Sequence, residues 1–217
     1  ESSIFITGNT AIDALRLTVQ EDYHHQVLDQ LDPQKKLVLV TMHRRENQGQ
    51  PMRAVFGALR EMVDAHPELE VVYPVHLSPA VQEAAKDILG EHDRIHLIAP
   101  LDVFDFHNLA SRSYFIMSDS GGVQEEAPSL GKPVLVLRDT TERPEGVKAG
   151  TLKLVGTDPE RVKEEMTALL TDPDLYQKMA SARNPYGDGK ASERIVQAIQ
   201  HYYGLVDSVS EFMEGEI

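Results

Sequence analysis

The sequence contains no cysteine among its 217 residues, which excludes disulfide bonds and thiol chemistry. It also lacks any apolar run close to the roughly 20 residues that span a bilayer. No basic segment followed by an apolar segment opens the chain, so the sequence predicts no secretory signal. The lack of cysteine is typical of a cytoplasmic protein, and we expect that location.

Basic residues are few, since 21 Lys and Arg stand against 35 Asp and Glu, for a formal net charge of −14. Nucleic acids and anionic membranes are bound by basic surfaces, so we expect neither as a partner. Apolar residues make up 41% and charged residues 26%, which excludes a disordered or fibrous chain. The length suits one large domain or two small ones.

Short apolar, β-branched runs alternate with longer segments of helical period. Runs that are apolar on both faces predict strands buried inside a parallel sheet. The predicted strands are Leu37–Thr41, Glu70–Val75, Ile95–Ile98, Tyr114–Ser118, Pro133–Leu137 and Leu152–Val155. The predicted helices are Met52–Ala65, Pro79–Leu89, Val103–Ser111, Glu160–Leu170, Asp174–Ala182 and Ala191–Tyr203. This order predicts an α/β fold with a doubly wound, Rossmann-like parallel sheet.

The two ends differ from this pattern. Ile4–Thr7 is a short strand-like run, and Ala11–Leu31 is a helical stretch without a partner strand. The abrupt start at Glu1 suggests a fragment or a processed product. We predict a hinge and docking segment at 1–32, a Rossmann-like domain at 33–190, a C-terminal helix at 191–204 and an acidic tail at 205–217.

Ligands of open parallel sheets bind beyond the carboxyl ends of the strands. After the first predicted strand, His43 is followed directly by Arg44 and Arg45. Guanidinium groups suit bidentate binding of phosphate. We therefore favour an anion-binding loop there over a solvated turn, which would also explain the charges.

A turn with Gly121 and Gly122 follows the fourth predicted strand. Glycines allow close backbone approach to a ligand, and free N–H groups at a helix start attract phosphate, although a tight turn alone explains the pair equally well. Glu126 shares a helix face with Gly122 and can accept sugar hydroxyls, whereas we expect Glu125 to be solvated. Pro128 should bend or end the helix nearby.

Other polar positions have weaker interpretations. The charged segment Arg138–Glu145 is well explained as a surface loop with internal ion pairs. His76, after the second predicted strand, is either a site residue or a histidine at a helix start. His96 lies within a strand run, where a hydrogen-bonded core histidine is the usual case.

Nine histidines raise the alternative of a metal hydrolase, with His43, His76, His107 and Asp119 as ligands. The two arginines that follow His43 would repel a divalent cation, and the sequence has no H-E-x-x-H pair. We therefore disfavour a metal site, and we otherwise read His107 as a surface or helix residue.

Five segments, in order, resemble the non-hydrolysing UDP-N-acetylglucosamine 2-epimerases. They are Thr7–Asp13, Thr41–Asn47, Ser118–Pro128, Gly131–Leu135 with Arg138–Glu145, and Gly187–Ser192. One departure is Ser78, where family members usually have Asn. The resemblance implies two Rossmann-like domains facing each other across a cleft, as in glycosyltransferases of the GT-B type. We expect this chain to be the second domain plus the hinge, with the first domain missing, and to form a homodimer when full length.

The resemblance also implies an activity, with no cofactor and no metal. The family interconverts UDP-N-acetylglucosamine and UDP-N-acetylmannosamine by eliminating UDP and adding it back. His43 matches the family's active-site histidine, close to the diphosphate. Ser120, Gly121 and Gly122 match the diphosphate-binding turn, and Glu126 matches the residue that holds the ribose hydroxyls.

Further residues match substrate positions of the family. Leu101 and Phe106 match positions around the uracil, and Arg143 matches a substrate-contacting arginine. Arg44 and His76 match positions that bind a second, activating UDP-N-acetylglucosamine in some bacterial members. Each of these roles is an expectation that the resemblance carries.

The carboxylates that move the C2 proton belong to the first domain in this family. Because that C–H bond is weakly acidic, a general base is essential, so we expect this chain alone to bind UDP weakly and not to epimerise. Two alternatives share the architecture: a glycosyltransferase and a non-catalytic nucleotide-sugar-binding module. The run from His43 to Asn47 favours the epimerase.

Overall fold

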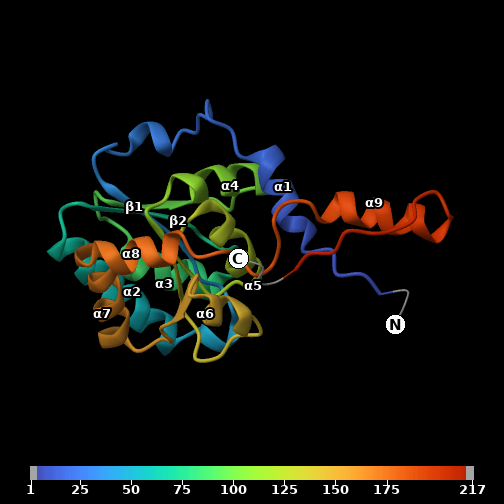
Figure 1. The fold of residues 1–217 in the computed structure, drawn as a ribbon. Coiled ribbons are helices and arrows are strands. Elements are labelled where there is room, and N and C mark those ends of the chain that lie inside the picture. Colours follow the sequence, from blue (N-terminus) through green and yellow to red (C-terminus); the bar gives the residue numbers. More distant parts are fainter. Residues whose placement is uncertain (1–3, 214–217) are drawn as a thin grey trace.

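Six parallel strands form one sheet at the centre of the computed structural model, which describes residues 4–213 (Figure 1). The strand order is β3-β2-β1-β4-β5-β6. The strands are β1 (Lys36–Thr41), β2 (Leu69–Pro74), β3 (Ile95–Ile98), β4 (Phe115–Ser118), β5 (Val134–Val136) and β6 (Leu152–Leu154). All six were predicted from the sequence, and the predicted α/β doubly wound sheet is confirmed.

Burial on both faces explains why these strands lack an alternating pattern. Val38 pairs with Val71 on one side and with Phe115 on the other, and all three are fully buried. Neighbouring Leu37 and Leu39 point to the opposite face, where they join a second apolar cluster. The sheet therefore separates two hydrophobic cores.

Helices cover both faces, as expected for a doubly wound fold. One core contains side chains of α2 (Gln50–Ala65), α3 (Pro79–Leu89), α7 (Pro159–Thr171) and α8 (Pro173–Ala180). The other contains side chains of α4 (Val103–Arg112), α5 (Gly121–Glu126) and the 3-10 turn Ala127–Leu130. Asp102, Asp158 and Asp172 cap α4, α7 and α8 by accepting backbone N–H bonds, a role that aspartate often has at a helix start.

The helix predicted over Ala11–Leu31 is confirmed only in its first part. The structure has α1 (Thr10–Thr18), then an irregular segment and a 3-10 turn at Leu28–Gln30. The guanidinium of Arg112 on α4 donates to the carbonyls of residues 20 and 21, and Asn108 binds the backbone at 18 and 20. These carbonyls and amides would be needed for helix bonds, so tertiary contacts override the local helical tendency.

The loop 138–145 holds one helix that the sequence analysis missed, α6 (Pro144–Ala149). Pro144 stands at its first position and Gly150 ends it in the left-handed conformation, with φ of 81°. This arrangement of proline at the start and glycine after the end is typical of short helices. The helix therefore could have been predicted from two residues.

The last helix, α9 (Ala191–Tyr202), lies beside α1 and away from the sheet (Figure 1). It is amphipathic as predicted, but Val196 and Ile199 of its apolar side are 52% and 55% exposed. The predicted strand at Ile4–Thr7 is absent and that segment is irregular. Phe212 returns beside it, donating its N–H to the Ile6 carbonyl at 2.7 Å and burying its ring.

The predicted division into four segments stays a prediction, and residues 1–3 and 214–217 of its outer segments lie outside the described residues. Within residues 4–213, no helix combines the length and the apolar character that crossing a membrane requires.

Candidate functional site

The strand order reverses between β1 and β4, the two central strands. At such a switch point the loops leave neighbouring strands in opposite directions, and a crevice forms beyond their carboxyl ends. The loop after β1 carries His43, and the turn after β4 carries Gly121 and Gly122. The topology thus brings together the two segments in which the sequence predicts anion binding.

Asp119 holds the loop after β1 in place. This carboxylate is fully buried and accepts the backbone N–H groups of His43 at 3.0 Å and Arg44 at 2.8 Å, and the side-chain amide of Asn47 at 3.0 Å. The Nδ1 atom of His43 lies 3.5 Å from Asp119 Oδ1. The hydroxyl of Tyr73 donates to a carbonyl beside the loop. Burial raises the pKa of Tyr73 most, and the charge of Asp119 raises it further.

A pocket of about 330 Å³ opens at the switch point. Its lining includes seven of the ten residues to which the sequence analysis assigns roles. They are His43, His76, Leu101, Phe106, Ser120, Gly122 and Glu126. The rings of His43 and His76 stack with centroids 5.3 Å apart and planes 11° from parallel. The structure therefore gathers residues from the segments that follow four neighbouring strands, while the role of each residue stays a prediction.

The turn after β4 begins α5 beside this pocket, since Ser120 and Gly122 line it. Ser120 precedes α5 without capping it through its side chain, so the first N–H groups of α5 have no intrahelical partner. A Cβ added at Gly122 would meet nothing nearer than the Ser120 Oγ at 4.0 Å. The same addition at Gly121 would approach the Glu142 carboxylate to 3.2 Å. The space above Gly122 is therefore free for a ligand.

Glu126 reaches the pocket from the far end of α5, with its side chain 20% exposed. Its Oε2 lies 3.4 Å from the Nε2 of His107. His107 is on a helix, as expected, but it is buried and not at the surface. Ala110 lies three residues further on the same buried face of α4, and this spacing could have revealed the burial.

Comparison with known proteins assigns the chain to a family. The family model described as UDP-N-acetylglucosamine 2-epimerase matches residues 1–200. The chain belongs to the UDP-N-acetylglucosamine 2-epimerase family. The resemblance found in the sequence motifs is thereby confirmed.

Individual members of the UDP-N-acetylglucosamine 2-epimerase family are similar over almost the whole chain. A Bacillus subtilis (strain 168) protein named UDP-N-acetylglucosamine 2-epimerase is 62% identical over 202 residues, which are 93% of this chain and 53% of that protein. A solved structure described as an S. aureus MnaA–UDP co-structure has a TM-score of 0.93 and 53% identity, covering 98% of this chain and 58% of that chain. The chain spans about half the length of the curated relatives it matches.

A UDP-GlcNAc 2-epimerase from Neisseria meningitidis was solved bound to UDP-GlcNAc. It has a TM-score of 0.83 and 44% identity, covering 90% of this chain and 54% of that chain. The fold predicted for a UDP-N-acetylglucosamine 2-epimerase half is therefore the fold observed.

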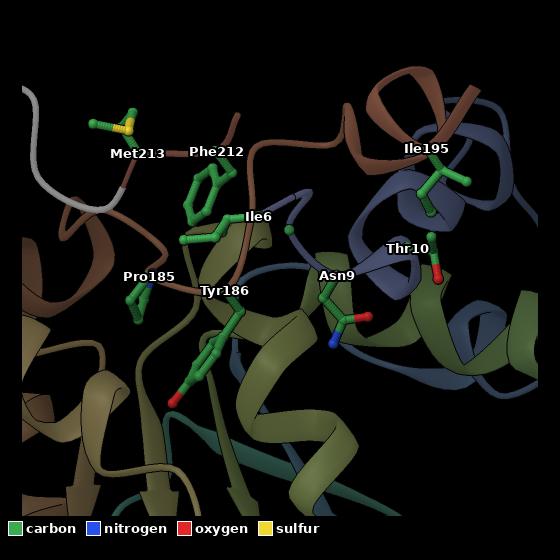
Figure 2. A pocket seen from close by; sticks show the side chains of 9 residues that line it. Ile6, Asn9, Thr10, Pro185, Tyr186, Ile195, Phe212 and Met213 are labelled. Carbon is green, nitrogen blue, oxygen red and sulfur yellow. The ribbon is translucent and has the colours of Figure 1, made fainter. Parts of the chain in front are cut away.

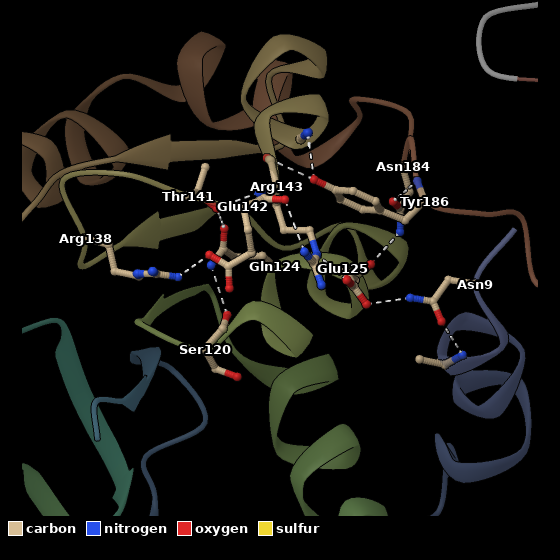
Figure 3. Close-up of polar contacts among 12 residues, drawn as sticks. Asn9, Ser120, Gln124, Glu125, Arg138, Thr141, Glu142, Arg143, Asn184 and Tyr186 are labelled. Carbon is tan, nitrogen blue, oxygen red and sulfur yellow. Dashed lines mark hydrogen bonds and ion pairs between the residues drawn. The ribbon is translucent and has the colours of Figure 1, made fainter. Parts of the chain in front are cut away.

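Three of the ten predicted residues do not line the pocket of this epimerase-family chain. Gly121 is buried beside it. Arg44 pairs with Glu142 at 3.0 Å. Arg143 pairs with Glu125, as Figure 3 shows. The expectation that Glu125 is solvated is wrong, because its side chain is only 13% exposed.

A network of polar contacts accounts for this position of Glu125. Its second oxygen accepts the side-chain amide of Asn9 at 2.5 Å, so α5 is tied to the segment before α1 (Figure 3). Glu142 also pairs with Arg138. A hydrogen bond from the backbone N–H of Glu142 lowers the pKa of this carboxyl, and the Arg138 guanidinium lowers it further. Of the internal ion pairs predicted for this loop, the structure shows Arg138–Glu142, whereas Arg44 and Glu125 join the loop to other segments.

A larger pocket of about 860 Å³ lies elsewhere, between the segment before α1 and the returning C-terminal segment (Figure 2). Ile6, Tyr186, Ile195 and Phe212 are among its lining residues, and none of those residues carries a charge. Without a charged group this pocket offers little to a diphosphate, so the smaller pocket is the candidate site.

The structure also bears on the metal-hydrolase alternative. Among residues 4–213, no three His, Asp or Glu side chains lie close enough together to hold a metal ion. His107 faces Thr18 and Glu126, whereas His43 faces Asp119, so the four proposed ligands do not converge. Asp119 follows a buried strand at the switch point, and that position could have marked it as a residue that supports the site.

Proposed function

We propose that this chain is the UDP-binding half of a UDP-N-acetylglucosamine 2-epimerase, which interconverts UDP-N-acetylglucosamine and UDP-N-acetylmannosamine. The observation that carries the proposal is one pocket that joins the imidazole of His43, the open amides before Gly122 and the carboxylate of Glu126. Relatives solved with UDP and with UDP-GlcNAc support a UDP-sugar as the ligand.

Each part of UDP has a matching group in this pocket. The amides at Gly121 and Gly122 suit the diphosphate, because they carry partial positive charge and lack internal partners. The Glu126 carboxylate suits the ribose hydroxyls as a charged acceptor. Leu101 and Phe106 offer an apolar wall to the uracil, and an aromatic ring can stack on a base.

The reaction that we propose begins with elimination. A base removes the C2 proton, the C1–O bond breaks, and UDP leaves with the electron pair of that bond, which gives 2-acetamidoglucal. Return of UDP to C1 and of a proton to the other face of C2 completes the epimerisation. A protonated His43 beside the diphosphate would stabilise the charge that develops on the departing UDP.

The base is not among the residues gathered here, and we propose that it comes from the other half of the full-length protein. Arg44 and His76 remain candidates for binding a second, activating UDP-N-acetylglucosamine. His76 stacks on His43, so a molecule held by His76 would lie next to the reacting diphosphate. A homodimer and a cytoplasmic location also stay predictions.

Calorimetry with UDP on the 217-residue chain tests the binding site. We expect Glu126→Ala to weaken UDP binding by about tenfold or more, since a hydrogen bond to a charged group contributes roughly 1.5–3 kcal/mol. Glu164→Ala is the matched control, because Glu164 is exposed on α7, which covers the other face of the sheet. Equal affinity of the Glu126 variant and the unmodified chain would remove the ribose assignment.

Turnover tests the activity itself. In heavy water, an epimerase incorporates deuterium at C2 of the sugar when both halves are present. We expect the 217-residue chain alone to show no epimerisation, and turnover by that chain would refute the assignment of the base to the other half. Sugar transfer to an acceptor without exchange at C2 would instead support a glycosyltransferase.

A further inference from the structure

His107 is a buried histidine that the proposed reaction does not use. Its side chain is 2% exposed, and it lies between α1 and α5. On one side its Nδ1 is 2.8 Å from the hydroxyl oxygen of Thr18. On the other side its Nε2 is 3.4 Å from Glu126 Oε2, and this buried Nε2 has no hydrogen-bond partner among the described residues.

The hydrogen bonds of Thr18 determine which ring nitrogen carries a proton. A threonine hydroxyl has a single proton to donate. That proton goes to the carbonyl of Ala14, at 3.0 Å. With this proton on the Ala14 carbonyl, the Thr18 oxygen is free to accept from His107 at 2.8 Å, and we assign a proton to the Nδ1 of His107 on this basis.

The other nitrogen then faces the carboxylate. In a neutral imidazole with a proton on Nδ1, Nε2 is an acceptor with a lone pair. A lone pair directed at the carboxylate of Glu126 from 3.4 Å would be repelled, most strongly where water is excluded. One additional proton between Nε2 and Oε2 turns this repulsion into a charge-assisted hydrogen bond.

We propose that His107 shares a proton with Glu126 and is the positioning residue that aims this carboxylate at the ribose. The inference rests on the proposed function, in which Glu126 binds the ribose hydroxyls. With one oxygen of Glu126 engaged by His107, the other is directed into the pocket. With the shared proton the His107–Glu126 pair has no net charge, so it repels the nearby diphosphate less than an isolated carboxylate would.

The surroundings of His107 are suited to holding it still. The adjacent Asn108 is fully buried, and its side chain donates to the carbonyls of Thr18 and Phe104 while accepting the N–H of Gln20. These bonds fix the end of α1 against α4, and with it the hydroxyl that sets the proton on Nδ1. A carboxylate oriented before the ligand arrives loses little freedom on binding.

A comparison of two ligands separates positioning from a general effect on folding. We would measure the affinity of the chain for UDP and for 2′,3′-dideoxyuridine diphosphate, which lacks the two hydroxyls. His107→Asn retains an amide near Nδ1 but leaves nothing at Nε2. We expect His107→Asn to lower the affinity for UDP about tenfold and the affinity for the dideoxy analogue by less than about twofold, because only UDP has the hydroxyls that the oriented carboxylate binds. His107→Gln, which can place an amide at Nε2, should recover part of the loss.

Two controls keep the outcomes distinct. His92→Asn removes another histidine–carboxylate pair, with Asp64 at 3.0 Å, at the opposite end of the sheet, and should change neither affinity. If the unmodified chain binds both ligands equally, the ribose contact of the proposed function fails. If it prefers UDP but His107→Asn weakens both ligands equally or neither, the positioning role is overturned.

A spectroscopic measurement on the unmodified chain tests the shared proton directly. In the chain with ¹⁵N-labelled histidine, we expect both ring nitrogens of His107 to report bound protons at neutral pH. Glu126→Gln should then shift the Nε2 signal and leave Nδ1 almost unchanged. A deprotonated Nε2 in the unmodified chain would overturn the proposal.

Discussion

Replacing Asp119 by asparagine tests how the loop after β1 is built. Both oxygens of the carboxylate accept hydrogen bonds. Oδ2 accepts the backbone N–H groups of His43 and Arg44 and the side-chain amide of Asn47. In Asp119→Asn the amide oxygen should take the Oδ2 position, because an NH₂ group there would face three donors. The NH₂ group then lies beside the Nδ1 and N–H of His43.

The expected loss of stability follows from the number of bonds. Asp119 is fully buried and accepts from three groups. Hydrogen bonds to charged groups contribute about 1 kcal/mol more than neutral ones, so the variant should lose about 3 kcal/mol of unfolding free energy. Asp87→Asn is the matched control, because Asp87 pairs with Arg53 on the surface, where an ion pair contributes about 0.2–1 kcal/mol.

The same change should alter His43 itself. With an NH₂ group next to it, Nδ1 must accept a hydrogen bond, so a neutral ring should carry its proton on Nε2. Urea unfolding measures the stability, and ¹⁵N spectra of labelled histidine report the tautomer. A variant with unchanged stability and with the proton on Nδ1 of His43 would refute the reasoning.

Two further predictions concern the pocket and the C-terminal region. Gly122→Ala should leave the unfolding temperature unchanged or slightly raised, because its Cβ meets no protein atom nearer than 4.0 Å, yet it should abolish UDP binding in calorimetry by filling the ligand space; undiminished binding would place the ligand elsewhere. The Arg194 guanidinium lowers the pKa of Asp188 to about 2, so this pair stabilises the fold above about pH 4 and its contribution disappears as the pH falls toward 2. Denaturant unfolding should therefore show a stability difference between Asp188→Asn and the unmodified chain at pH 6 that shrinks by pH 2.5, and a constant difference would contradict the assignment.

Local sequence patterns were sufficient to predict most of the strands and helices of the fold. The buried strands are β-branched runs, and three aspartates followed two or three residues later by free N–H groups mark helix starts. The end of α1 was missed because it depends on Arg112 and Asn108, about 90 residues away in the sequence. Contacts of that range leave no periodic signal in the segment they reshape.

For the candidate site, too, the sequence predicted what depends on local patterns and missed what depends on long-range contacts. Its loops could be located from the sequence, since they follow adjacent strands at the switch point of a doubly wound sheet. Its supporting contacts could not, because Asp119 binds residues 72 to 76 positions away and Glu125 binds Asn9 across 116 positions. Helical spacing places Glu125 on the outer face of α5, and only the folded chain shows what covers it.

The position of α9 has a consequence for how the molecule opens. Among the helices and strands, α1 is its principal neighbour, and much of its apolar side is exposed. Local unfolding requires less free energy where few buried contacts are broken. Amide hydrogens of α9 should therefore exchange with deuterium through local unfolding of this helix, whereas those of β1 and β4 should exchange only when the whole domain unfolds.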